Sequence, residues 1–426
     1  MNYFATLVFL LLSANGTFLP FFNIDWFLVD VLFIWIGLAY NRFDKRDLRF
    51  GAAFMLAYIC YCSFRSYFFN NLPIRFYVSD IIYLFKYILP SLIFCALLKE
   101  KAIDYLSRVI IDLTKISIPL YCIQLVAGDV LYNIGNAIGL PPATPGYTVT
   151  NFVVFTYVKE HHYQNSGFSW EPGAFGFFLI IALMLQLFKN GFKIDIGVKW
   201  LVLGVVTTFS TTSFVALGLV FLMYCRANGV KFSTLAILGV PVLAVAVVKL
   251  PFLLSKVIDI YNHDLKDLQN LEFLSAWYLR QGREMPFNRF ASMIFIYDEF
   301  KARLIFGVSN IFTETVPYLK NANTSSGTFE YFAKFGLVAF VYLMTRLCQF
   351  FRKFTQQKEL IIYCVLLILV LGFSESIFVL PIMTNFYFLY FYAQPLDDEF
   401  EEDEEEENES DISETDPAQN TRIAYR

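Results

Sequence analysis

The chain has 426 residues, of which 57% are hydrophobic, 19% are aromatic and only 16% are charged. A soluble domain carries about 25% charged residues, so this composition excludes a soluble globular protein. Apolar runs long enough to cross about 30 Å of hydrocarbon recur along the chain, which predicts an all-α polytopic membrane protein.

The net charge of −4 combines two regions of opposite sign, because residues 397–426 carry −12 and residues 1–396 carry +8. We expect 1–396 to be an integral membrane domain and 397–426 to be a disordered acidic tail, either solubilising or partner-binding. The seven cysteines lie in apolar runs or beside them, and no Cys/His cluster has ligand spacing. Neither a disulfide framework nor a zinc site is therefore predicted.

Twelve membrane segments are predicted, at about residues 3–19, 24–40, 50–64, 80–98, 116–138, 176–188, two within 200–225, 232–248, 328–344, 360–373 and 377–392. No Lys or Arg precedes Arg42, which favours a retained first helix over a secretory signal. Four positive charges within 41–49 mark a cytoplasmic loop, so both termini are expected in the cytoplasm.

The stretch 200–225 could be one crossing helix or two short ones. Its centre, residues 207–213, reads Thr-Thr-Phe-Ser-Thr-Thr-Ser, which is a poor sequence for the middle of a bilayer. Two short helices that meet near the outer face keep Lys199, Arg226 and Lys231 on the inside, so we prefer this interpretation.

Charged groups inside membrane segments are costly and therefore point to function. Asp30 and Lys86 each lie about six residues, or roughly 9 Å, below the outer end of a predicted segment. We expect these two residues to form an ion pair, which either serves a site or only holds two helices together.

Other polar residues map to the outer ends of the predicted segments. They are Glu171, the 207–213 turn, Glu330, Lys334, Glu375 and Asn385. Their common side predicts a site that opens outward, beneath a 79-residue outer loop, Lys249–Gly327.

This outer loop supplies positive charge. Arg280 and Arg283 have i, i+3 spacing, which places them on one helical face, and Arg289 follows. The planar fork of arginine suits a diphosphate, although a solvated face paired with Glu284, Asp298 and Glu299 is the alternative. The run 287–306 has helix-like apolar spacing, and we expect it to rest on the membrane or on the bundle.

Residues 164–175 read Gln-Asn-Ser-Gly-Phe-Ser-Trp-Glu-Pro-Gly-Ala-Phe and precede a long apolar run. Glu171 stands just before Pro172, at a helix entrance where free N–H groups and the helix dipole favour negative charge. Two roles are open for this carboxylate, a cap that fixes the helix entrance and a chemical group in a site.

The segments 165–176, 288–308, 328–337 and 373–381 resemble, in their order and spacing, the O-antigen polymerase and O-antigen ligase superfamily of bacterial inner-membrane glycosyltransferases. The resemblance implies a GT-C-like helical fold, with donor and acceptor glycans carried on undecaprenyl diphosphate at the periplasmic face. It implies no metal or other cofactor and no nucleic acid. Implied partners are membrane lipids, chain-length regulators and flippase proteins.

Under this resemblance, Glu171 is the catalytic, acceptor-side carboxylate, and Arg280, Arg283 and Arg289 bind diphosphate. The supporting candidates are His162, Asp30, Lys86 and Glu375.

Two departures from the family pattern bear on the activity. Gln164 stands where relatives often carry arginine, and His161 or His162 could substitute for it. Ligases place a histidine near the end of the long loop, but residues 321–330 contain none, which favours a polymerase of O-antigen, capsule or exopolysaccharide. A polysaccharide exporter is the alternative from another class, and the long outer loop argues against it.

Overall fold

The computed structural model of the protein describes residues 1–14, 25–138, 149–231, 251–281, 285–310, 322–323 and 326–393. All of them belong to one compact unit, Met1–Ala393. The predicted acidic tail and the predicted segment 232–248 lie outside the described residues. The described part is mostly helical, and four of its helices are long and apolar enough to cross a membrane, namely Lys45–Phe69, Ile74–Gly135, Pro172–Lys189 and Gly327–Phe351. This agrees with the predicted all-α membrane class.

The helices of the first 227 residues are α1 (Asn2–Ser13), α2 (Asp25–Ala39), α3 (Lys45–Ser63), α4 (Ile74–Tyr83), α5 (Leu89–Leu98), α6 (Ala102–Ile138), α7 (Pro172–Lys189), α8 (Ile196–Thr208) and α9 (Thr211–Ala227). The later helices are α11 (Pro251–Gln269), α12 (Leu271–Arg280), α13 (Arg289–Phe300), α14 (Gly327–Phe351), α15 (Lys358–Ser374), α16 (Pro381–Thr384) and α17 (Phe386–Tyr392). Two small sheets were not predicted. Strand β1 (Val149–Asn151) pairs antiparallel with β2 (Thr156–Val158), and β3 (Met285–Pro286) pairs parallel with β4 (Ala322–Asn323).

Two predicted segments differ from the structure. The segment predicted at 80–98 lies within a longer helical stretch, Ile74–Gly135, and contains a π-helical turn, η3 (Leu84–Ile88), between α4 and α5. The last predicted segment, 377–392, consists of short pieces, because Pro381 lacks the N–H that would continue a helix from the preceding turn.

The predicted division of 200–225 into two helices is confirmed. Helix α8 ends where Phe209 adopts a left-handed backbone (φ 48°), and α9 starts after Ser210, whose hydroxyl accepts a hydrogen bond from the Ser213 N–H. A polar Ser/Thr turn favours this break, because hydroxyl side chains satisfy the backbone groups that a helix end exposes.

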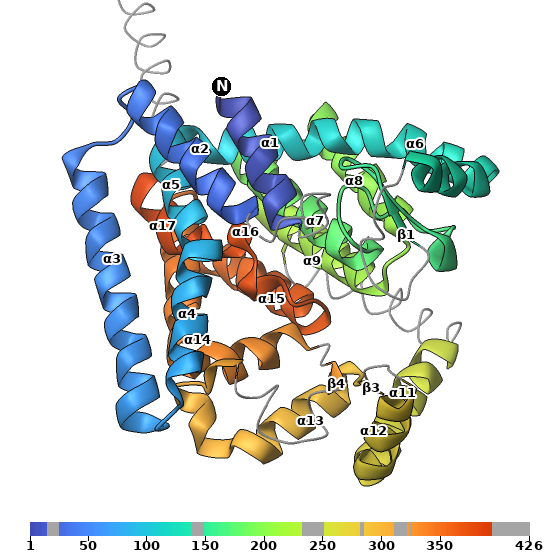
Figure 1. Ribbon diagram of the computed structural model, residues 1–426. Helices are drawn as coiled ribbons and strands as arrows, with labels where there is room; N and C mark the ends of the chain where they lie inside the picture. The colour runs from blue at the N-terminus through green and yellow to red at the C-terminus, as the bar shows by residue number, and fades with distance from the viewer. Residues whose placement is uncertain are drawn as a thin grey trace, which may run out of the picture. The chain divides into compact units, whose positions relative to one another are not determined.

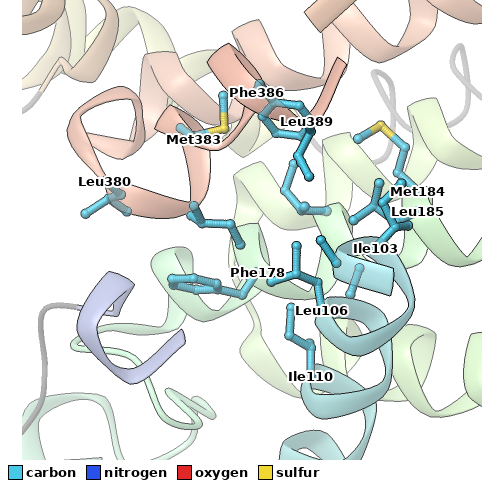
Figure 2. Packing of buried hydrophobic residues seen from close by; sticks show 14 of the residues in the cluster. Ile103, Leu106, Ile110, Phe178, Met184, Leu185, Leu380, Met383, Phe386 and Leu389 are labelled. Carbon is cyan, nitrogen blue, oxygen red and sulfur yellow. The ribbon is translucent and has the colours of Figure 1, made fainter. Parts of the chain in front are cut away.

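Helix α7 forms the centre of the core, with most of its residues buried. It packs against α6, α8 and α9, and α15 contacts it as well (Figure 1). Figure 2 shows one part of this core, where Leu106 of α6, Phe178 of α7 and Leu389 of α17 belong to one apolar cluster. Because most residues of α7 are buried among these helices, its first turn is held in a fixed position.

Helix α14 is broken at Gly336, whose backbone (φ 87°, ψ 163°) lies in a region that only glycine occupies readily. The break frees carbonyl groups of the preceding turn, and a buried carbonyl needs a donor. The Ala333 oxygen accepts from the Val308 N–H at 2.6 Å, and the Phe335 oxygen accepts from the Tyr61 hydroxyl at 2.6 Å. The end of the long loop and α3 are thereby attached to the break in α14.

We expect Gly336→Ala to destabilise the protein by more than about 2 kcal/mol, because strain at such a backbone adds to steric overlap. A Cβ at this position would lie 2.3 Å from the Phe306 carbonyl carbon, which is backbone and cannot rotate away. The control is Gly229→Ala, because Gly229 also has positive φ but has no atom within 4 Å of the added Cβ. Thermal unfolding of the purified protein in detergent compares the two. Equal losses would contradict the close approach at Gly336.

Candidate active site

The loop before α7 is held by Asn165. Its side-chain amide donates to Ser117 Oγ of α6 at 2.9 Å and to Thr207 Oγ1 of α8 at 3.0 Å. The side-chain oxygen of Asn165, Oδ1, accepts a hydrogen bond from the N–H of Gly167, which has positive φ (49°). The Asn-Ser-Gly sequence therefore forms a buried turn that positions the following Trp-Glu-Pro at the start of α7.

Glu171 is the N-cap residue of α7 by its backbone, with extended φ and ψ and a carbonyl that accepts from the Phe175 N–H at 3.0 Å. Its side chain does not cap the helix. Oε1 of the carboxylate instead accepts a hydrogen bond of 2.8 Å from Trp170 Nε1. Of the two roles left open by the sequence, side-chain capping is thus not observed.

The Glu171 carboxylate lies beside the carboxyl group of Glu375, which follows α15, and the two side chains are within hydrogen-bonding reach of each other. Glu375 is only 9% exposed. Burial, and next the adjacent Glu171 carboxyl, raise the pKa of Glu375 well above its usual range. Two carboxylates this close cannot both ionise at low cost, so the pair is expected to share one proton.

Two glycines make room for this pair. A Cβ on Gly173, in the first turn of α7, would lie 2.2 Å from Glu375 Oε1. A Cβ on Gly327, at the start of α14, would lie 2.0 Å from the Glu375 backbone oxygen. Neither position accommodates a side chain without displacement. The start of α7, the start of α14 and the end of α15 therefore lie close together around Glu375.

Arg289, the first residue of α13, brings a positive charge to the pair. Its Nε donates to the Ser374 backbone oxygen at 3.0 Å, and its Nη2 lies 3.6 Å from Glu375 Oε1. This guanidinium lowers the pKa of Glu375, but burial and Glu171 outweigh it. The Arg289 side chain is 46% exposed, so it can bind a further anion while it contacts the carboxyl pair.

Hydroxyl groups extend the polar cluster to two more helices. Thr212 of α9 donates to Ser374 Oγ at 2.8 Å, and Ser376 donates to a carboxylate oxygen of Glu330 in the first turn of α14. Of the polar helix ends expected to gather, the structure brings together Glu171, the 207–213 turn, Glu330 and Glu375, whereas the Lys334 ammonium lies over the ring of Tyr83. Asn385 lies elsewhere, buried beside Cys95 of α5, whose Sγ is 3.5 Å from its side-chain oxygen.

Of the three predicted diphosphate-binding arginines, the structure brings only Arg289 to the carboxyl pair. Arg280 is exposed at the C-terminus of α12 and forms no ion pair within the described part of the chain. Arg283 lies outside the described residues. His162 is exposed, and its ring packs edge-on against Tyr163.

The predicted ion pair between Asp30 and Lys86 does not form. Asp30 is buried, and one of its carboxylate oxygens has no hydrogen-bond partner. Lys86 instead lies over the ring of Tyr87, at 5.4 Å from its centroid. Lys86 belongs to η3, and the wider turn of a π-helix rotates it away from the direction that α-helical spacing predicts.

The sequence interpretation missed a buried ion pair between Arg65 and Asp80, both of which have fully buried side chains. Arg65 also donates to the Lys334 backbone oxygen at 2.6 Å, beside the break in α14. The other Asp80 oxygen accepts from the Ser309 hydroxyl at 2.7 Å. The signal was present, since both residues border predicted membrane segments, where ionisable groups are costly.

The cluster combines the groups that a transfer to a hydroxyl requires. One carboxylate of the pair can accept a proton, the raised pKa of Glu375 favours a neutral carboxyl that can donate a hydrogen bond, and Arg289 can hold an anion. No protein-family model, curated protein or solved structure matches this chain.

Proposed function

We propose that the protein is a polysaccharide polymerase of the bacterial inner membrane. It transfers a growing glycan from undecaprenyl diphosphate to a lipid-linked repeat unit at the periplasmic face, with both chain termini in the cytoplasm. The observation that carries the proposal is the carboxyl pair of buried Glu375 and part-exposed Glu171, with Arg289 in contact with it. The sequence resemblance around 165–176 supports it.

In this mechanism Glu171 is the general base, because it is the more exposed carboxyl of the pair and is oriented by Trp170. The acceptor hydroxyl oxygen forms a bond to the anomeric carbon of the donor glycan as Glu171 takes the hydroxyl proton. The bond from that carbon to the diphosphate breaks, and the lipid diphosphate leaves with the electron pair. Arg289 stabilises the negative charge that develops on the leaving group.

Glu375 has a different role from Glu171. As the buried, protonated member of the pair it donates a hydrogen bond to Glu171 and keeps that carboxylate in place. Arg280 and Arg283 remain proposed contacts to diphosphate at the approach to the site, and chain-length regulators and flippases remain proposed partners.

Polymerase is favoured over ligase because no histidine occurs in 321–330, the stretch that leads into α14 and so to Glu375. A polymerase is also favoured over an exporter. The polar cluster lies at helix ends and beside α13, which belongs to the long loop, and this is where a site at the membrane surface would lie.

Deletion of the gene separates these activities. A strain that lacks the polymerase is expected to display single repeat units where the parent displays long chains, and expression of the protein restores the long chains. Loss of all units from the outer face would indicate export. Retention of long chains on the carrier lipid, without attachment, would indicate a ligase.

The raised pKa of Glu375 predicts the pH dependence of the reaction. The pair is active with one shared proton, so wild-type activity should fall as the pH rises through the raised pKa and Glu375 ionises. Glu375→Gln keeps a neutral donor, and should retain activity within about tenfold at neutral pH and lose the alkaline decline. Polymer formation by membranes at several pH values measures both. An unchanged alkaline decline in the variant would contradict the assignment of the proton.

A further inference from the structure

The position of Arg289 depends on how helix α13 begins. Arg289 is the first residue of α13, and Asn288, the N-cap residue, makes no side-chain hydrogen bond that caps the helix. The first turn of any α-helix exposes backbone N–H groups that need an acceptor. In α13 this acceptor comes from α11, on Asp264, which precedes Asn288 by 24 residues.

Asp264 uses both of its carboxylate oxygens at the start of α13. Oδ2 accepts a hydrogen bond of 3.1 Å from the Ala291 backbone N–H, and Oδ1 accepts one of 2.7 Å from the side-chain amide of Asn288. Asp264 is fully buried. A buried carboxylate is costly unless its oxygens are hydrogen-bonded, and a helix N-terminus favours its negative charge. Asp264 therefore fixes the residues on both sides of Arg289.

Aromatic contacts hold the same turn of α13. The ring of Phe290 lies 5.8 Å from the ring of Tyr261 on α11 and 5.8 Å from the ring of Phe373 in the last turn of α15. Phe373 directly precedes Ser374, whose backbone oxygen accepts a hydrogen bond from Arg289 Nε at 3.0 Å. The first turn of α13 thus lies between α11 and the end of α15, and this placement brings the guanidinium to the carboxyl pair.

We propose that Asp264 is a positioning residue of the candidate active site, which caps α13 from α11 and thereby holds Arg289 in contact with the carboxyl pair. The inference rests on the proposed polymerase function, in which Arg289 stabilises the charge on the leaving group. Helix α11 is then a required part of the site, although it contributes no group that contacts the substrate. A displacement of about 1 Å in such a group can lower a rate about a hundredfold.

Hydrogen–deuterium exchange of the purified full-length protein in nanodiscs tests the cap itself. Asp264→Ala removes both acceptors, so the backbone amides at the start of α13 should exchange faster than in the wild type. Asp264→Asn keeps an oxygen that can accept from the Ala291 N–H, and should restore most of the protection. Asp267→Asn is the matched control, because Asp267 lies on the same helix and pairs with exposed His263 at 3.1 Å. Unchanged exchange in Asp264→Ala would overturn the proposal.

Loss of the Arg289 contact has a measurable consequence at Glu375. Arg289 lowers the pKa of Glu375, whereas the neighbouring Glu171 raises it. Release of Arg289 should therefore raise the pKa of Glu375 further. Removal of the Asp264 charge acts in the opposite direction, because loss of a nearby negative charge favours ionisation of a carboxyl group. The direction of the shift therefore distinguishes loss of positioning from a direct effect of charge.

Dicyclohexylcarbodiimide measures this shift without enzymatic activity, because it reacts with protonated carboxyl groups. Labelling at a series of pH values, followed by mass spectrometry, gives the pH at which labelling of Glu375 falls to half. Arg289→Ala should raise this pH. Asp264→Ala should raise it by up to the same amount, and the double variant should raise it no further than Arg289→Ala. Asp264→Asn and Asp267→Asn should stay close to the wild-type value. A lower pH in Asp264→Ala, or additive shifts in the double variant, would overturn the proposal.

Thermal unfolding of each variant checks that the fold is retained. If Asp264→Ala does not fold, Asn288→Ala supplies the test, because it removes one of the two contacts of Asp264. Asn288→Ala should also raise the pH of half-labelling, to a smaller extent than Arg289→Ala. An unchanged pH in a folded Asn288→Ala variant would then count against positioning through this contact.

Polymer formation distinguishes failure of the positioning role from failure of the proposed function. Asp264→Ala should lower the rate of polymer formation about tenfold or more, and should add no loss in an Arg289→Ala background. A wild-type protein that forms no polymer, while Asp264→Ala shows faster exchange and the upward shift, would refute the polymerase and keep the positioning role. Equal rates of polymer formation with and without the Asp264 carboxylate would refute only the positioning role.

Discussion

Replacing Glu171 by glutamine is expected to abolish long polymer and to leave single repeat units on the cell surface. Removal of a general base lowers a rate by about 10²–10⁴, and chain growth needs many successive transfers, so even the smaller loss shortens the product strongly. The length distribution of extracted polysaccharide on a gel, from a deletion strain that expresses the variant, measures the effect.

The same variant distinguishes a catalytic role of Glu171 from a structural role. Glutamine removes one charge from a crowded carboxyl pair, and the side chain of Glu171 does not cap α7. Thermal stability should therefore be maintained or increased while polymer is lost. Glu272→Gln, an exposed substitution in the first turn of α12, should leave both polymer and stability unchanged. If Glu171→Gln lost stability and polymer together, a structural role for this carboxylate would be the better account.

The largest expected effect on stability comes from the buried ion pair between Arg65 and Asp80. Arg65→Ala should destabilise the protein by about 3–5 kcal/mol, because removal of one partner leaves the other charge buried without compensation. It also removes the donor to the Lys334 oxygen at the break in α14. Chemical or thermal unfolding in detergent, with expression level as a second readout, measures this loss.

The double variant Arg65→Met, Asp80→Asn tests whether the loss arises from the unpaired charge. Without a charged group to bury, it should be more stable than Arg65→Ala. Arg226→Ala is the control, because the Arg226–Glu359 pair is exposed and should change stability little. A double variant as unstable as Arg65→Ala would indicate that the lost backbone contacts matter more than the charge.

Local sequence signals sufficed for the elements around the candidate site. Pro172 after Glu171, followed by a long apolar run, predicts the start of α7 where the structure has it. The Ser/Thr turn at 207–213 predicts the break between α8 and α9. The apolar spacing within 287–306 predicts α13, which packs against α11 and α14. Each of these features depends on residues within a few positions of one another.

Long-range partners could not be predicted in the same way. The sequence placed Glu171 and Glu375 on the same side, but their pairing depends on Gly173 and Gly327, which admit the Glu375 turn. Asp30 and Lys86 were matched by depth along ideal α-helices, and the π-helical turn at η3 invalidates that geometry. Contacts of this kind are set by packing among helices distant in the chain.

The most direct test of the account is transfer by the purified protein in proteoliposomes that contain synthetic lipid-linked repeat units. Wild-type protein and Glu375→Gln are expected to form a ladder of products and to release one lipid diphosphate for each new glycosidic bond. Glu171→Gln is expected to form none at the same protein level. A ladder from Glu171→Gln at the wild-type rate, or no ladder from the wild-type protein, would contradict a glycan transfer site at the carboxyl pair.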